Sequence, residues 1–69
     1  MTIRNFFAGM SLLRRYFADA DLDVPAWGCE ACTFFINLPI PVTPEDEKRL
    51  LALGWRVHDS KLQWSADNY

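Results

Sequence analysis

The chain has 69 residues, enough for one small domain spanning 1–69 and too few for a second hydrophobic core. Seven basic and nine acidic residues give a formal net charge of −2, so the chain lacks the basic excess of nucleic-acid-binding proteins. Direct nucleic-acid binding is therefore not expected. No apolar run approaches the length of about 18 residues that a membrane span needs.

Residues 2–20 predict an amphipathic helix. The apolar residues that recur at spacings of three or four, and so share one helical face, are Ile3, Phe6, Met10, Leu13 and Phe17. Thr2 is a candidate N-cap, so we expect a helix from about residue 3 to residue 18. Gly9 lowers helix propensity by about 1 kcal/mol relative to Ala, and we interpret it as a point of close packing.

Residues 19–31 predict an acidic loop, because Asp, Pro and Gly interrupt both helical and strand periodicity. Its acids, which match the first, third, fifth and last positions of an EF-hand calcium loop, are Asp19, Asp21, Asp23 and Glu30. The Gly that this loop needs at its sharp turn is replaced by Val24. We therefore do not predict a calcium site. The acids are interpreted as a solvated loop or as a contact surface for a basic partner.

Residues 32–38 predict a strand whose first face carries Cys32, Phe34, Ile36 and Leu38. Phe35 falls on the second face, which suggests that both faces of the sheet are at least partly covered, with one helix on each as one arrangement. Pro39 and Pro41 end the strand because proline has no N–H to donate.

Residues 43–54 carry the clearest local signal, a short capped helix. Thr43 is a candidate N-cap, Pro44 occupies the first helical position and Asp46 the third, in a variant of the capping box. Glu45, Asp46 and Glu47 lie at the positive end of the helix dipole. Gly54 predicts a left-handed stop.

Residues 55–65 predict a β-hairpin. With Asp59–Ser60 as the turn, Val57 opposes Leu62 and Trp55 opposes Trp64, and these four side chains share a face. A longer loop is the alternative, since Asp-Ser is a weaker tight turn than Asn-Gly. Residues 66–69 are expected to fray. The predicted fold is α+β, in the order α-β-α-β-β, with a three-stranded antiparallel sheet packed with two helices.

Cys29 and Cys32 form a C-x-x-C pair beside Trp27. A structural zinc site needs four ligands, and this chain adds only His58 to the pair. Redox C-x-x-C pairs begin a helix, whereas this one precedes a predicted strand. We favour two small packing residues over metal or redox sites. His58 is expected on the hairpin surface, and no motif places a nucleophile near it. We predict no catalytic residue, no metal site and no cofactor.

Residues 44–64, PEDEKRLLALGWRVHDSKLQW, resemble the ending of many small phage and prophage accessory proteins, a short helix followed by Gly-Trp and a hairpin. In length, order of elements and acidic loops, the whole chain resembles the anti-CRISPR class of phage inhibitors. That resemblance implies a small, non-enzymatic protein in the host cytoplasm, presenting acids to the nucleic-acid channel of a CRISPR effector complex. The class has no shared motif, so it assigns no role to any residue.

Together with this resemblance, the sequence predicts a non-enzymatic inhibitor that binds a host protein or, as the resemblance implies, a CRISPR effector complex, as a monomer or homodimer. The expected contact residues are Asp19, Asp21, Asp23 and Glu30, supported by Glu45, Asp46 and Glu47. One alternative is a small zinc-stabilised module using Cys29 and Cys32. Another is a homodimeric accessory protein whose surplus aromatic residues form the interface. The lack of a signal peptide and of a disulfide framework predicts a reduced, cytoplasmic location in the host cell.

Overall fold

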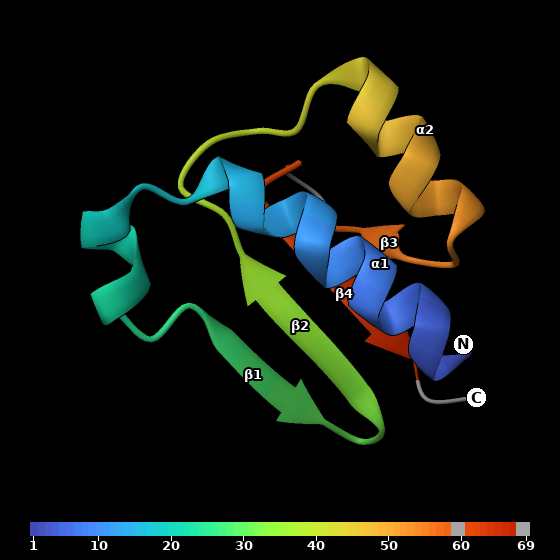
Figure 1. Ribbon diagram of the computed structural model, residues 1–69. Coiled ribbons are helices and arrows are strands. Elements are labelled where there is room, and N and C mark those ends of the chain that lie inside the picture. Colours follow the sequence, from blue (N-terminus) through green and yellow to red (C-terminus); the bar gives the residue numbers. More distant parts are fainter. Residues whose placement is uncertain (59–60, 68–69) are drawn as a thin grey trace.

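The computed structural model describes residues 1–58 and 61–67 (Figure 1). Its first helix, α1, spans Ile3–Leu13 and continues as a 3₁₀ turn, η1, over Arg14–Tyr16. The predicted N-cap is confirmed, because Thr2 Oγ1 accepts a hydrogen bond from the Asn5 N–H at 3.1 Å. The predicted end at residue 18 is too late, because the backbone turns extended at Phe17.

The predicted loop 19–31 is wrong in two places. Residues Asp19–Asp23 form a 3₁₀ turn, η2, and Trp27–Glu30 form a strand, β1. With β2 at Thr33–Asn37, β3 at Arg56–Val57 and β4 at Gln63–Asp67, the sheet has four strands in the order β1-β2-β4-β3. All neighbouring strands are antiparallel, so the α+β class is confirmed and the three-stranded sheet is corrected to four strands.

A tight turn joins β1 to β2. Glu30 pairs with Thr33, which leaves Ala31 and Cys32 as a two-residue loop with φ angles of 47° and 68°. Positive φ at both loop positions defines a type I′ hairpin turn. Such turns normally carry Asn-Gly, so the sequence Ala-Cys gave no turn signal. Cys32 consequently lies in the turn and not on the predicted strand face.

The second helix, α2, spans Pro44–Ala52 with Thr43 as its N-cap, as predicted. Gly54 adopts a φ of +94°, which confirms the left-handed stop. In the following hairpin, Val57 pairs with Trp64 and not with Leu62, so the predicted register is wrong by two residues. A shift of two preserves the predicted faces. The predicted turn residues Asp59 and Ser60 lie outside the described residues.

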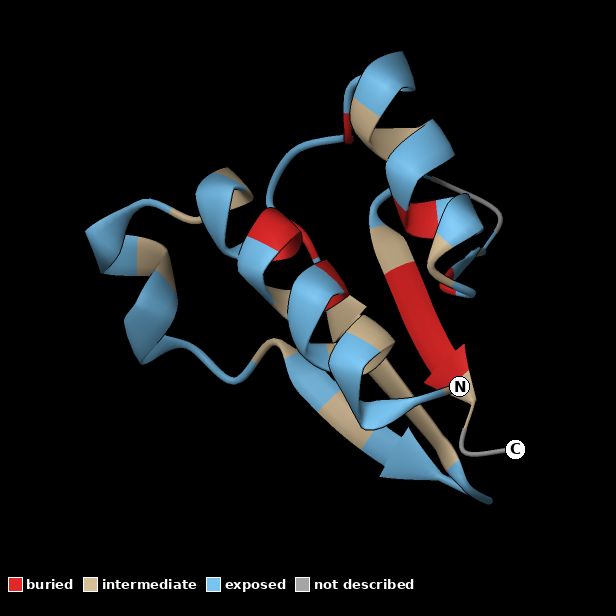
Figure 2. Ribbon diagram, turned by 45° about the vertical axis from the view of Figure 1, so that its right-hand side comes forward, coloured by how far each residue is buried: buried red, intermediate tan, exposed pale blue. Residues whose placement is uncertain are grey.

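Both helices pack on one face of the sheet. The buried residues form a single core with members from α1, α2 and β4 and the segments beside them, namely Leu12, Leu13, Leu38, Val42, Leu50, Trp55, Trp64 and Ala66. In Figure 2 the buried residues gather on β4 and on the sides of the helices that face the sheet. Ala66 belongs to β4, so it does not fray as predicted; Asn68 and Tyr69 lie outside the described residues.

The arrangement with one helix on each face is therefore wrong. On the face without helices, the Phe35 ring packs over Gly28, its partner on β1. A Cβ on Gly28 would lie 2.4 Å from Phe35 Cζ. The ring thus occupies the space left by the missing side chain. Within the described ranges, no helix has both the length and the apolar character needed to cross a membrane.

Candidate interaction surface

Three of the predicted contact residues lie on η2, which projects from one side of the molecule (Figure 1). Asp21 Oδ2 accepts a hydrogen bond from the Ala18 N–H at 3.0 Å, which fixes the start of the turn. Arg14 donates to the Phe17 carbonyl at 3.1 Å and lies 3.8 Å from the Asp19 carboxylate. The turn is thus held by its own side chains. Asp19 and Asp23 remain exposed on it.

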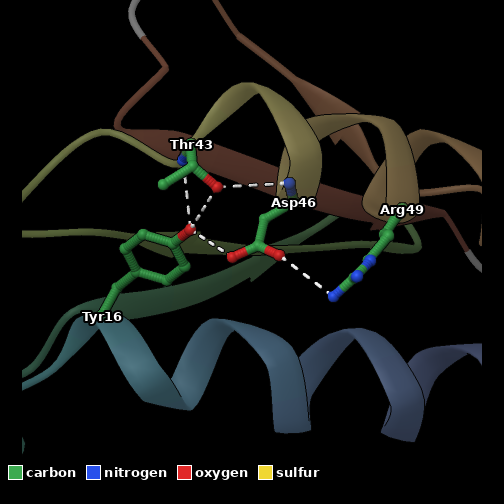
Figure 3. Close-up of polar contacts among 4 residues, drawn as sticks. All are labelled: Tyr16, Thr43, Asp46 and Arg49. Atoms are coloured by element: carbon green, nitrogen blue, oxygen red, sulfur yellow. Dashed lines mark hydrogen bonds and ion pairs between the residues drawn. The ribbon is translucent and has the colours of Figure 1, made fainter.

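The sequence suggested that Asp46 is an exposed acid on α2, but its carboxylate is engaged by neighbouring side chains. Its carboxylate accepts a hydrogen bond from the Tyr16 hydroxyl at 2.5 Å and lies 3.6 Å from the Arg49 guanidinium (Figure 3). The Thr43 N–H donates to Tyr16 Oη at 3.1 Å, and the Asp46 N–H donates to Thr43 Oγ1 at 3.3 Å. In a complete capping box, the Asp46 carboxylate would accept a hydrogen bond from the Thr43 N–H. Here Tyr16 Oη accepts that hydrogen bond instead.

This cluster has one consistent set of protons. The Tyr16 proton points at the Asp46 carboxylate, so Tyr16 Oη is free to accept from the Thr43 hydroxyl at 3.3 Å. Only 14% of the Asp46 side chain is exposed. The cluster joins η1 to the start of α2, so Asp46 serves the fold. It is poorly placed as the contact residue that the sequence predicted.

Glu47 is also engaged within the protein. Its carboxylate lies 3.1 Å from Lys61 Nζ, which ties α2 to the approach to β4. Glu45 is exposed on the first turn of α2. Glu30 is exposed at the end of β1, beside the hairpin turn. The predicted contact residues therefore fall into three separate groups, on η2, at the β1–β2 turn and on α2, and do not form one surface.

Cys29 and Cys32 are both exposed free thiols. Cys29 pairs with Phe34 across β1–β2 and shares its face, so it lies on the side of the sheet that carries the helices. His58 lies elsewhere, with its Nε2 3.2 Å from Ser65 Oγ. Among residues 1–58 and 61–67, no group of three His, Cys, Asp or Glu side chains is arranged to hold a metal ion.

Sequence analysis did not predict the contact between His58 and Ser65, because no motif placed a nucleophile near His58. Register explains it: Arg56 pairs with Ser65, so the two-residue slip brings His58 to the same part of β4. A Ser–His pair is the beginning of a nucleophilic site. Ser65 is buried, however, and in the described part of the chain no carboxylate is bonded to His58. We assign the pair a structural role.

Sequence analysis did not locate two separate hollows between α1 and β1, which together we call the α1–β1 groove. At one end, Ile3 and Phe6 face Cys29 and Phe34 across a hollow of about 380 Å³. At the other end, a hollow of about 180 Å³ lies among residues of α1, η1, η2 and β1, including Met10, Arg14, Asp21, Leu22 and Trp27.

Two aromatic side chains, one on β1 and one on α1, are largely open to solvent, and Trp27 lines the smaller hollow. Trp27 is 64% exposed although it stacks on Phe34, with ring centroids 5.9 Å apart. Phe7 is 61% exposed and occupies the α1 stripe between Ile3 and Met10. The composition showed more aromatic residues than a small core needs. Where the exposed ones lie depends on β1, a strand that the sequence did not reveal.

Comparison of the chain with models of protein families, with curated proteins and with solved structures finds no significant match to any of the three.

Proposed function

We propose that this protein is a non-enzymatic inhibitor that binds a host protein or a CRISPR effector complex in the cytoplasm of the host cell. In this proposal it competes with nucleic acid for a basic surface of its target. The single observation that carries the proposal is η2, an acidic turn that projects from the body and is held in shape by Arg14 and Asp21. A preformed turn loses little conformational entropy when it binds.

The contact proposed for η2 uses Asp19 and Asp23. Both are exposed, and Asp19 makes only a long, solvent-screened ion pair with Arg14 at 3.8 Å. Asp21 holds the turn through the Ala18 N–H and is a positioning residue. Complementary charge of this kind steers association and sets specificity more than it adds affinity. Glu30 extends the acidic character to the other end of β1.

The test is an immunity assay in bacteria that carry active CRISPR systems of several types. Expression of the protein is expected to restore phage plating against one type, and the protein should co-purify with that effector complex. Mobility-shift competition with target DNA then measures the binding site. Asp19→Lys combined with Asp23→Lys should weaken inhibition about tenfold or more, since each 1.4 kcal/mol of lost binding is a factor of ten.

The control is Glu45→Lys, a single charge reversal of the same kind at an exposed site on α2, away from η2. It should leave inhibition unchanged, and circular dichroism should show both variants folded. Full inhibition by the η2 variant would refute the acidic contact. Failure to restore plating against every type tested, with no effector complex co-purified, would refute the inhibitor proposal itself.

A further inference from the structure

The free edge of β1 has a defined hydrogen-bonding pattern. The Asn37 N–H donates to the Ala26 carbonyl at 2.7 Å, so Ala26, Gly28 and Glu30 direct their backbone groups toward β2. Trp27 and Cys29 alternate with them and direct their N–H and C=O groups outward. β1 is an edge strand of the sheet, and no strand of the described residues pairs with it on that side. The opposite edge strand, β3, is only two residues long and carries Arg56.

We propose that β1 pairs with β1 of a second copy of this chain, in antiparallel register about a two-fold axis at Gly28. The two four-stranded sheets then form one continuous sheet. Trp27 of each copy exchanges backbone hydrogen bonds with Cys29 of the other, and Gly28 faces Gly28. This dimer does not depend on the identity of the proposed target.

The register follows from the chain itself. A shift that pairs Trp27 with Trp27 would place Cys29 opposite Pro25, which has no N–H to donate. The opposite shift pairs Cys29 with Cys29 and places Trp27 opposite Ala31, which lies in the hairpin turn with a φ of 47°. Only the register centred on Gly28 uses the outward groups of both residues in strand geometry.

Side chains favour the same register. Glu30 falls opposite Ala26 of the second copy, so no like charges face each other directly across the new strand pair. Trp27 falls beside Cys29 of the second copy, on the face that carries the helices, where sulfur and aromatic ring make a favourable contact. The α1–β1 grooves of the two copies then lie side by side on one face of the joined sheet.

The expected buried area places this dimer among small interfaces. Each aromatic side chain can bury about 150–250 Å², and Trp27 and Phe7 are still 64% and 61% exposed. With Ile3 and Val24 beside them, the contact stays near or below the roughly 800 Å² per partner of a standard interface. Weak and transient contacts lie at this low end of interface size, so we expect a dissociation constant on the order of micromolar.

The dimer would also bear on the proposed function. Because Glu30 lies opposite Ala26 of the second copy, it approaches the η2 turn of that copy, three residues upstream of Ala26. Within one copy, Glu30 and the η2 acids lie at opposite ends of β1. In the dimer, Glu30 of one copy and the η2 acids of the other lie together at each end of the paired strands. Their mutual repulsion predicts that dimerisation strengthens as salt concentration rises.

The test is analytical ultracentrifugation of the whole chain across the micromolar range. The weight-average mass should rise from the monomer value of 8.0 kDa toward twice that value. Cys29→Pro should remain monomeric, because proline removes an outward N–H that β2 does not use. Cys29→Ser is the matched control and should dimerise like the parent chain. A monomer at every concentration, or undiminished dimerisation of Cys29→Pro, would overturn the proposal.

A second experiment tests the register even if Cys29→Pro does not fold. In a chain carrying Cys29→Ser and Cys32→Ser, Ala26→Cys and Glu30→Cys are made separately, mixed and oxidised by air. The two positions face each other at a closely spaced, non-hydrogen-bonded pair, within reach of a disulfide. A disulfide-linked heterodimer should form in the mixture and not from either protein alone. A dimer without this cross-link would show a different interface and overturn the proposal.

Discussion

The indole ring of Trp55 lies where a side chain at position 9 of α1 would be: a Cβ on Gly9 would lie 1.9 Å from Trp55 Nε1. The ring is held there because Trp55 Nε1 donates to the Asn5 carbonyl at 3.2 Å. Gly9→Ala gains about 1 kcal/mol of helix propensity. It loses about 1–3 kcal/mol to overpacking and about 1 kcal/mol with the displaced hydrogen bond. We predict a net loss of about 1–3 kcal/mol in the free energy of unfolding, measured by urea denaturation.

Ser11→Ala is the matched control on the same helix, because Ser11 is exposed. Replacing it removes no contact with the core and should raise stability by a few tenths of a kcal/mol through propensity alone. If Gly9→Ala were as stable as Ser11→Ala, the close approach of α1 to Trp55 would be wrong.

Tyr16 and Asp46 are predicted to be energetically coupled. Tyr16→Phe removes the hydroxyl that donates to Asp46 and accepts from the Thr43 N–H, while Asp46→Ala removes the acceptor. Each change should cost about 1–3 kcal/mol, because it leaves partners in a half-buried cluster unpaired. A double-mutant cycle should give a coupling of about 0.5–3 kcal/mol. The same cycle with Glu45 in place of Asp46 should give none, and equal couplings would contradict a specific Tyr16–Asp46 hydrogen bond.

The sequence correctly predicted those structural features that depend only on residues close together in the chain. The caps Thr2 and Thr43, the stop at Gly54 and the alternation of Phe34 and Ile36 all act over a few residues, and the structure has each of them. The reason for Gly9 was also visible, since a glycine inside a helix is unfavourable unless something needs its space. What packs there, Trp55, was not visible.

Contacts between distant residues explain most of the errors. Tyr16 and Thr43 are 27 positions apart, so no local pattern could show that Tyr16 completes the cap. β1 was hidden because its turn, Ala31–Cys32, lacks the glycine and asparagine that normally mark a type I′ turn. The acids of η2 and α2 have the same local character, and only the fold separates exposed Asp23 from half-buried Asp46.

The Ala31–Cys32 turn is predicted to be strained and improvable. Positive φ costs a non-glycine residue about 1–2 kcal/mol, and both residues have it. Ala31→Asn combined with Cys32→Gly should raise the free energy of unfolding by about 1–2 kcal/mol in a urea titration. Cys32→Ala keeps the strain and should be close to neutral. A stabilisation by Cys32→Ala equal to that of the double change would show that the thiol, and not the backbone, is unfavourable.

The two fully buried tryptophans should respond differently to replacement by phenylalanine. Trp64 is 0% exposed, and its Nε1 has no hydrogen-bond partner among the described residues, whereas Trp55 Nε1 is bonded to Asn5. Both changes remove a similar volume from the core. Trp64→Phe also removes an unpaired donor, whose burial costs about 1–3 kcal/mol, while Trp55→Phe loses a hydrogen bond worth about 1 kcal/mol. Trp55→Phe should therefore be more destabilising by about 2–4 kcal/mol in chemical denaturation.

A second measurement separates this explanation from a simple difference in packing. Trp55→Phe withdraws the indole nitrogen from Gly9, so Gly9→Ala should lose much less stability in that background than in the parent chain. In the Trp64→Phe background the loss from Gly9→Ala should change little, because the three atoms nearest to a Cβ at position 9 all belong to Trp55 and none to Trp64. Equal losses in all three backgrounds would mean that the Trp55 ring does not determine the residue at position 9.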